Sequence, residues 1–331
     1  MNRDAIERFK GALVRRRELL LDWMRGNGPK DLPGCDGELI RTVEETLHRI
    51  DHGEFGRCAI CHGEVETSRL ALDYTASVCI ECLSEIDRRS LERELEMAAQ
   101  VQKNLLPRNV PALPNTDIAV HSQPAGIVGG DYFDFFPAPG GAQSFAIGDV
   151  MGKGLPASML MSSLQASLRI LGPELGHLTD LAVRINALFR YNLSLVRFIS
   201  MILARVDTEK KQIQYLNAGH NPALLWRSSD RSGIWLQPTG PAVGLVKDPI
   251  YTTEEIDLHV GDLLIMYTDG LVEARNGSSD EFGATRLLEF AAANEHLDAE
   301  RFVAGLRNAV LRHSGSKLHD DLTLMVIRSN A

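Results

Sequence analysis

The sequence predicts an α+β protein, with strands and helices in separate runs behind a smaller cysteine-bearing part. Strand-like segments at 199–206, 213–217 and 223–226 follow one another without an intervening helical pattern, which disfavours a parallel, doubly wound sheet. Further strands are predicted at 118–121, 143–147, 263–267 and 322–328. Helical periodicity is found at 155–171, 179–193, 284–293 and 299–313.

Length and composition limit the functional classes. A chain of 331 residues suggests two or three domains, and a hydrophobic fraction of 44% is enough for a packed core. The net charge of -9 speaks against non-specific binding of nucleic acid. No apolar run is long enough to cross a membrane, and the charged start at Met1 to Asp4 does not resemble a signal peptide. We therefore expect a cytoplasmic protein with no membrane partner.

The first 82 residues are predicted to form a helical hairpin followed by a metal-binding finger. Apolar residues recur at three- and four-residue steps over 4–25 and again over 37–52. Glycine and proline at 26–29 end the first helix, so two antiparallel helices are the simplest arrangement.

Two Cys-x2-Cys pairs follow the hairpin, formed by Cys58 with Cys61 and by Cys79 with Cys82. Thiolates on two tight turns can converge on one tetrahedral zinc ion, and four protein ligands make such a site structural. A redox dithiol is the alternative, although one Cys-x2-Cys pair would suffice for it. Cys35 has no partner by spacing and is interpreted as a bystander.

Residues 83–107 are predicted to form a helical linker. No glycine or proline occurs from Leu83 to Leu106, and Pro107 ends the segment. A heptad-like seam runs through Leu91, Leu95, Ala98, Gln102 and Leu105. The seam is only about two heptads long. It therefore indicates either a helix lying on the following domain or a homodimeric coiled coil.

Four aspartates stand in short apolar frames where strands are expected to end: Asp131, Asp149, Asp269 and Asp320. Carboxylates gathered in one place repel one another and stay ionised together when cations lie among them. Any one of these residues alone would be an ordinary turn aspartate. Four in these frames predict a site for Mg²⁺ or Mn²⁺, which prefer oxygen ligands.

The motifs resemble those of the metal-dependent, protein phosphatase 2C-like (PPM) enzymes of the SpoIIE and RsbU type. The resemblance runs from about Leu105 to Ile327. Its motifs are Val128-Gly129-Gly130-Asp131-Tyr132, Gly148-Asp149-Val150-Met151-Gly152-Lys153-Gly154, Asn217-Ala218-Gly219-His220-Asn221-Pro222, Tyr267-Thr268-Asp269-Gly270 and Asp320-Asp321-Leu322-Thr323. It implies that residues 108–331 form an α/β/β/α sandwich of two antiparallel sheets flanked by helices.

The same resemblance implies the activity of a protein serine/threonine phosphatase that uses two Mn²⁺ or Mg²⁺ ions. The implied ligands are Asp149, which bridges both ions, the carbonyl of Val150, Asp269 and Asp320 at the first ion, and Asp131 at the second. By the same analogy, the substrate is a phosphorylated STAS-domain anti-sigma-factor antagonist in a partner-switching pathway. An inactive, phosphatase-like scaffold is the alternative.

Residues around the implied ligands carry less certain roles. Gly152, Lys153 and His220 are candidates for contacting the phosphate, although a solvated lysine and a structurally bonded loop histidine are the alternatives. Asp321 is expected to be the bystander of its pair, and Asp134 to support the metal ligands.

The cysteine segment resembles the zinc finger of the DksA/TraR family over about Ile50 to Leu83. That family binds RNA polymerase through acidic residues at the tip of a long helical hairpin. The turn at 26–30 in this chain carries no acids, so polymerase binding is only a weaker alternative. We expect instead a sensory or docking module that regulates the phosphatase through the linker helix.

Overall fold

The computed structural model describes residues 10, 11, 14, 17, 18, 44, 47, 48, 50–52, 55–58, 60–66, 70, 78–82, 85–192, 198–316 and 318–330. Most of the two predicted N-terminal helices and Cys35 lie outside these residues, although the described positions within 10–18 and 44–51 are helical. The chain divides into two compact units, Met1–Glu94 with Tyr191–Arg197 and Leu95–Arg190 with Phe198–Ala331. The predicted domain boundaries at residues 82 and 107 remain predictions.

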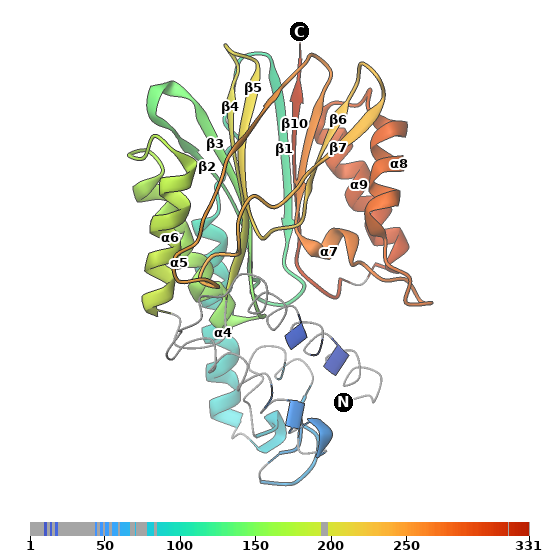
Figure 1. Cartoon of the computed structure of the whole chain (residues 1–331). Coiled ribbons are helices and arrows are strands. Elements are labelled where there is room, and N and C mark those ends of the chain that lie inside the picture. The colour runs from blue at the N-terminus through green and yellow to red at the C-terminus, as the bar shows by residue number, and fades with distance from the viewer. Residues whose placement is uncertain are drawn as a thin grey trace. The chain divides into compact units, whose positions relative to one another are not determined.

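The larger unit is built on two five-stranded sheets whose strand pairs are all antiparallel (Figure 1). The first sheet has the order β1-β10-β9-β6-β7 and the second has the order β2-β3-β4-β5-β8. The strands are β1 (Thr116–Gln123), β2 (Asp131–Pro137), β3 (Gln143–Val150), β4 (Ile199–Asp207), β5 (Gln212–Ala218), β6 (Ala223–Arg227), β7 (Ser232–Leu236), β8 (Glu254–Asp257), β9 (Leu263–Tyr267) and β10 (Leu322–Ser329).

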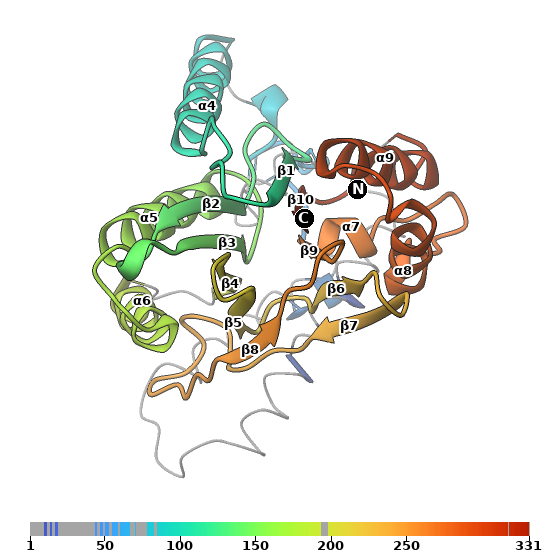
Figure 2. The same cartoon turned by 90° about the horizontal axis from the view of Figure 1, so that it is seen from above.

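Helices cover the outer face of each sheet (Figures 1 and 2). They are α5 (Leu155–Leu171) and α6 (Leu178–Asn192) on the second sheet, and α8 (Gly283–Asn294) and α9 (Ala299–His313) on the first. The remaining helices are α4 (Glu85–Leu105), the short α7 (Asp269–Val272) and the 3-10 turns η1 (Ile80–Cys82) and η2 (Pro139–Gly141). The predicted α/β/β/α sandwich is thus confirmed.

Alternation along the strands explains the layers. In β2, Phe133 and Phe135 join the core between the two sheets, whereas the intervening residues point towards the helical side. In β10, Met325 belongs to the core between the sheets, whereas Leu324 and Val326 pack in the cluster that includes α8 and α9. This two-residue period decides which side chains can enter the interior of the sandwich.

Among the described residues, no helix is long and apolar enough to span a membrane.

Candidate functional site

Two of the four predicted aspartates meet across one pair of strands. Asp131 is the first residue of β2 and lies directly opposite Asp149 near the end of β3. Both residues are in phase with the phenylalanines that point into the sandwich, so both carboxylates are directed between the sheets. The β2–β3 pairing therefore brings the first two acidic motifs together.

The other two aspartates lie at the same end of the first sheet. Asp269 begins α7 two residues after β9 ends, and Asp320 stands two residues before β10 begins. Because β9 and β10 are antiparallel neighbours, with Tyr267 opposite Leu324, the end of one lies beside the start of the other. Each sheet thus contributes one pair of acids.

Thr268 connects the two pairs. Its hydroxyl donates to Asp131 Oδ2 at 2.7 Å and accepts the backbone N–H of Thr323 at 3.0 Å. Both threonine side chains are fully buried. Thr323 Oγ1 lies 3.0 Å from the hydroxyl of Ser122 on β1. The hydrogen bond from Thr268 to Asp131 thus joins the two sheets at their acid-bearing end, and Thr323 and Ser122 extend the network within the first sheet. Sequence reasoning did not single out these residues.

The electrostatics of these acids indicate a cation site. Burial, followed by the charges of Asp149 and Asp321, raises the pKa of Asp131 well above its ordinary value. Burial, followed by the charges of Asp320 and Glu273, raises the pKa of Asp269 to about 7. Carboxylates in this situation ionise readily only with a compensating positive charge, and an all-oxygen donor set suits Mg²⁺ or Mn²⁺.

The acids do not form one compact ligand group. Among the described residues, only the four cysteines place three or more potential ligand atoms within 4.8 Å of one another. The all-oxygen donor chemistry of the two acid pairs nevertheless fits hard divalent ions, with Asp131 and Asp149 on one sheet and Asp269 and Asp320 on the other.

The segment after Asp149 wraps close to the acids. The carbonyl of Val150 lies only 2.6 Å from where a Cβ of Gly130 would be, so glycine is needed for this approach. Gly154 precedes α5 with φ of 74° and ψ of -153°, a conformation that residues with a Cβ rarely adopt. Lys153 lies with its ammonium 2.8 Å from Asp320 Oδ2 and donates to the carbonyl of His319 at 2.6 Å.

His220 is a buried bridging residue. Its Nδ1 lies 2.7 Å from the hydroxyl of Ser200, and its Nε2 lies 3.0 Å from the carbonyl of Tyr267. Nε2 must therefore carry the proton and donate, while Nδ1 accepts from the serine. Burial lowers the pKa of His220 to about 4. A neutral ring with both nitrogens engaged fits the structural interpretation of this residue better than contact with phosphate.

Asp134 faces the wrong layer to support the metal ligands, contrary to expectation. It is out of phase with Asp131 along β2, and its carboxylate is bound by the guanidinium of Arg169 on α5 and by the hydroxyl of Tyr132. The carboxylate is fully buried, whereas the Arg169 side chain is 42% exposed. Asp134 therefore fixes α5 to the second sheet.

The end of α4 contacts the loop that leads to Asp131. Gln102 is buried, donates through Nε2 to the carbonyl of Gly129 at 2.6 Å, and accepts the N–H of Gly129 at 3.1 Å. Among the other described residues of the predicted seam, Leu95, Ala98 and Leu105 are half-buried, but Leu91 is exposed. The C-terminal half of the seam thus lies against the rest of the larger unit. Dimerisation through this helix remains a prediction.

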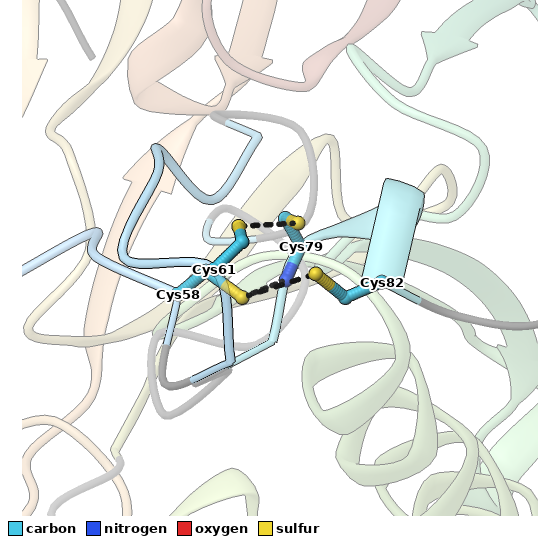
Figure 3. Close-up of side chains that lie close together, drawn as sticks. All are labelled: Cys58, Cys61, Cys79 and Cys82. Carbon is cyan, nitrogen blue, oxygen red and sulfur yellow. Dashed lines mark hydrogen bonds between the residues drawn. The ribbon is translucent and has the colours of Figure 1, made fainter.

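In the smaller unit, the four predicted zinc ligands converge (Figure 3). Cys58 Sγ lies 3.6 Å from Cys82 Sγ, and Cys61 Sγ lies 3.6 Å from Cys79 Sγ. These separations are far too long for disulfides. They are close to the roughly 3.8 Å expected between sulfur ligands at about 2.3 Å from a tetrahedral zinc.

Backbone N–H groups favour the thiolate form at one cysteine of the cluster. The N–H groups of Cys61 and Cys79 lower the pKa of Cys58 to about 6, which favours the thiolate that binds metal. Glu66 accepts the N–H of Ile80 at 2.9 Å and so connects the loop after the first cysteine pair to the second pair. A small core that includes Phe55, Val65 and Leu70 packs beneath the cysteines.

Comparisons with known proteins agree with this geometry. The profile of the Stage II sporulation protein E (SpoIIE) family matches residues 139–330. Phosphoserine phosphatase RsbU of Bacillus subtilis is 32% identical over 246 residues, which cover 73% of this chain and 71% of RsbU.

A solved structure of the RsbU and RsbW domains of a Mycobacterium tuberculosis protein has a TM-score of 0.60 and 26% identity, covering 69% of this chain and 63% of that one. The RNA polymerase-binding transcription factor DksA of Escherichia coli is 36% identical over 56 residues, which are 16% of this chain and 37% of DksA. The two resemblances seen in the motifs are therefore confirmed.

Proposed function

Because the chain belongs to the SpoIIE family of protein phosphatase 2C-type enzymes, it is a phosphatase, and we propose that it removes phosphate from a phosphoserine or phosphothreonine of a STAS-domain anti-sigma-factor antagonist. The observation that carries the proposal is the convergence of four acidic segments at one end of the sandwich. The names of two relatives, RsbU and RsbP, describe phosphoserine phosphatases. Together with the RsbW domain in the solved neighbour, they support a place in a partner-switching pathway.

The chain's own residues prepare the site for a phosphate dianion. We propose that Asp149, the carbonyl of Val150, Asp269 and Asp320 would hold one ion, and that Asp131, together with Asp149, would hold the other. When bound, two Mn²⁺ or Mg²⁺ ions would acidify a water molecule, neutralise the phosphoryl oxygens and align the attack. Thr268 orients Asp131 for this task, since its hydroxyl donates to the carboxylate.

Lys153 is the only one of the three predicted phosphate-contacting residues with a charge suited to an anion. Its side chain is 43% exposed, and its ammonium lies beside Asp320, at the same end of the sandwich as the acids. A half-exposed lysine in this position can turn towards an incoming phosphoprotein. We propose that Lys153 and the backbone near Gly152 contact the substrate, and that His220 does not.

Regulation through the smaller unit is the second part of the proposal. The cysteine cluster would hold one structural zinc, and α4 leads from that unit to Gln102, which holds the loop before Asp131. A structural change in the N-terminal module, or dimerisation through the exposed part of α4, would alter the position of α4 and, through Gln102, of the loop before Asp131. The thiolates are expected to persist in the reducing cytoplasm.

Turnover of p-nitrophenyl phosphate by the full chain tests the enzyme assignment. Asp149→Ala and Asp269→Ala should abolish Mn²⁺-dependent hydrolysis, whereas Asp248→Ala, at an exposed position, should behave as the unmodified protein. Chelation should stop turnover, and added Mn²⁺ should restore it. Activity that survives chelation, or survives in both site variants, would contradict the assignment; no turnover at any Mn²⁺ concentration would favour the scaffold.

The substrate assignment needs a separate assay. Purified STAS-domain proteins carrying phosphoserine should be dephosphorylated much faster than unrelated phosphoproteins, as followed by phosphate release and mass spectrometry. Equal rates on all phosphoproteins would contradict the proposed substrate but would leave the phosphatase assignment intact.

A further inference from the structure

Asp321, which the sequence analysis treated as a bystander, accepts backbone hydrogen bonds from the segment before β2. Its Oδ1 accepts the backbone N–H of Ala125 at 2.7 Å, and its Oδ2 accepts that of Gly130 at 2.6 Å. Oδ2 also lies 3.4 Å from the N–H of Asp131. The residue is 8% exposed. One carboxylate therefore binds both ends of the 125–131 loop, which is 190 residues away in the sequence.

Two glycines make this approach possible. A Cβ at Gly129 would overlap the carboxylate of Asp321, and a Cβ at Gly130 would lie 2.6 Å from the carbonyl of Val150. Neither glycine has a positive φ, so the requirement is for space rather than for an unusual backbone conformation. Gly129 thus leaves room for the carboxylate of Asp321, and Gly130 leaves room for the carbonyl of Val150, the residue after Asp149.

Asp321 also contacts the third acidic segment. Its backbone oxygen lies where a Cβ of Gly270 would be, so the residue after Asp269 passes directly over it. Asp320 precedes it in the chain. Asp321 therefore touches or adjoins the segments that carry Asp131, Asp269 and Asp320, although it is not among the assigned ligands.

Resting on the proposed function, we propose that Asp321 is a positioning residue that shapes the 125–131 loop and thereby sets the affinity of the metal position served by Asp131. Only a carboxylate can do this, because both of its oxygens accept and neither donates. An asparagine would turn an NH₂ group towards at least one backbone N–H. The side chain is the same size, but one end of the loop would lose its acceptor.

The test compares the full-length protein with Asp321→Asn by hydrogen exchange and by Mn²⁺ titration. Peptides covering 124–131 should exchange about tenfold faster or more in the variant, since a hydrogen bond to a charged acceptor is lost. Peptides from β4 and β5 should keep their exchange rates. Calorimetric Mn²⁺ titration should show one of two sites weakened at least tenfold, with KM for p-nitrophenyl phosphate unchanged at saturating Mn²⁺.

A second pair of variants keeps the test decisive if Asp321→Asn fails to fold. Gly129→Ala places a methyl group against the carboxylate of Asp321. This variant should show the same faster hydrogen exchange over 124–131 and the same loss of Mn²⁺ affinity as Asp321→Asn. Gly126→Ala lies in the same loop, where the nearest atom to the added Cβ is 3.7 Å away, and should behave as the unmodified protein.

The outcomes separate the two proposals. Unchanged exchange over 124–131 and unchanged Mn²⁺ binding in Asp321→Asn, or equal behaviour of Gly129→Ala and Gly126→Ala, would overturn the positioning role. Faster exchange throughout the larger unit, which is the catalytic unit, would also overturn the positioning role, because that result would indicate general destabilisation. Absence of turnover in the unmodified protein would refute the proposed function, while exchange and Mn²⁺ binding would still decide the role of Asp321.

Discussion

Acidification should destabilise the catalytic unit through His220, and the His220→Gln variant should lack this effect. The buried imidazole is neutral in the folded protein, with its pKa lowered to about 4, whereas the unfolded chain has a value near 6.5. Protons therefore bind the unfolded chain first. The stability that His220 contributes is complete above pH 6.5 and is lost as the pH falls towards 4.

The size of the effect follows from the two pKa values. Between pH 7.5 and pH 5, linkage predicts a loss of about 2 kcal/mol, and the full difference between the two pKa values corresponds to about 3 kcal/mol below pH 4. Other groups titrate in the same range, so only the difference between the two proteins isolates this contribution. Glutamine does not titrate, and its effect on packing is the same at every pH.

Urea denaturation at fixed metal concentration measures the difference. The chain has three tryptophans, and Trp23→Phe leaves Trp226 and Trp235 as fluorescent reporters of the catalytic unit. The stability advantage of the histidine protein over His220→Gln should shrink by about 2 kcal/mol from pH 7.5 to pH 5. A pH-independent difference would refute the buried, neutral state of His220.

Three further predictions use matched variants or metal removal. Arg169→Leu leaves the carboxylate of Asp134 buried without its cation and should cost about 3 kcal/mol in urea denaturation, whereas Arg184→Leu, at an exposed position on α6, should change stability by less than about 0.5 kcal/mol. Gly270→Ala should remove Mn²⁺-dependent turnover because the added Cβ overlaps a backbone oxygen, whereas Gly277→Ala meets nothing within 4 Å and should retain it; equal activities would contradict the packing. A strong chelator should release one zinc per chain, measured by elemental analysis, and speed hydrogen exchange across the cysteine cluster; unchanged exchange after zinc release would exclude a structural role.

The sequence predicted the seven strands with simple apolar patterns to within three residues, the largest difference being at the end of β3 (Gln143–Val150), but it did not reveal β2, β7 or β8. Strand β2 is buried on both faces apart from its last residue, so it shows no alternation, and its aspartates suggested a turn. Strand β8 is a short, mostly exposed segment with three acids, Glu254, Glu255 and Asp257, and therefore has no apolar period. Both strands depend on their neighbours, through pairings that a single segment cannot specify.

The acids of the site were accessible from the sequence because each stands in a recognisable motif, and Asp149, Asp269 and Asp320 also adjoin a clear strand pattern. Their supporting residues were not. Thr268 and Asp321 occur inside motifs that the sequence analysis quoted, but their roles come from contacts with residues 137 and 191 positions away, respectively. Gln102 looked like a seam residue because its spacing is heptad-like, and only the fold shows that its partner is Gly129. Spacing along the chain identifies candidate ligands; the residues that orient them are set by the packing of the two sheets.

The buried acid pairs that would bind metal are expected to lower the stability of the folded protein when no metal is bound. Burial and neighbouring carboxylates raise the pKa of Asp269 from 3.8 to about 7, so ionising it costs stability progressively between these values, up to about 4 kcal/mol above pH 7. In the presence of chelator at pH 8, Asp269→Asn should therefore be more stable than the unmodified protein. Bound dications reverse this order once their stabilisation exceeds that cost, since Mn²⁺ at ten thousand times its dissociation constant stabilises the folded protein by about 5 kcal/mol. If chelator and Mn²⁺ give the same ranking of the two proteins in urea denaturation, these carboxylates are not held together at the expense of stability, and the electrostatic argument for the metal site fails.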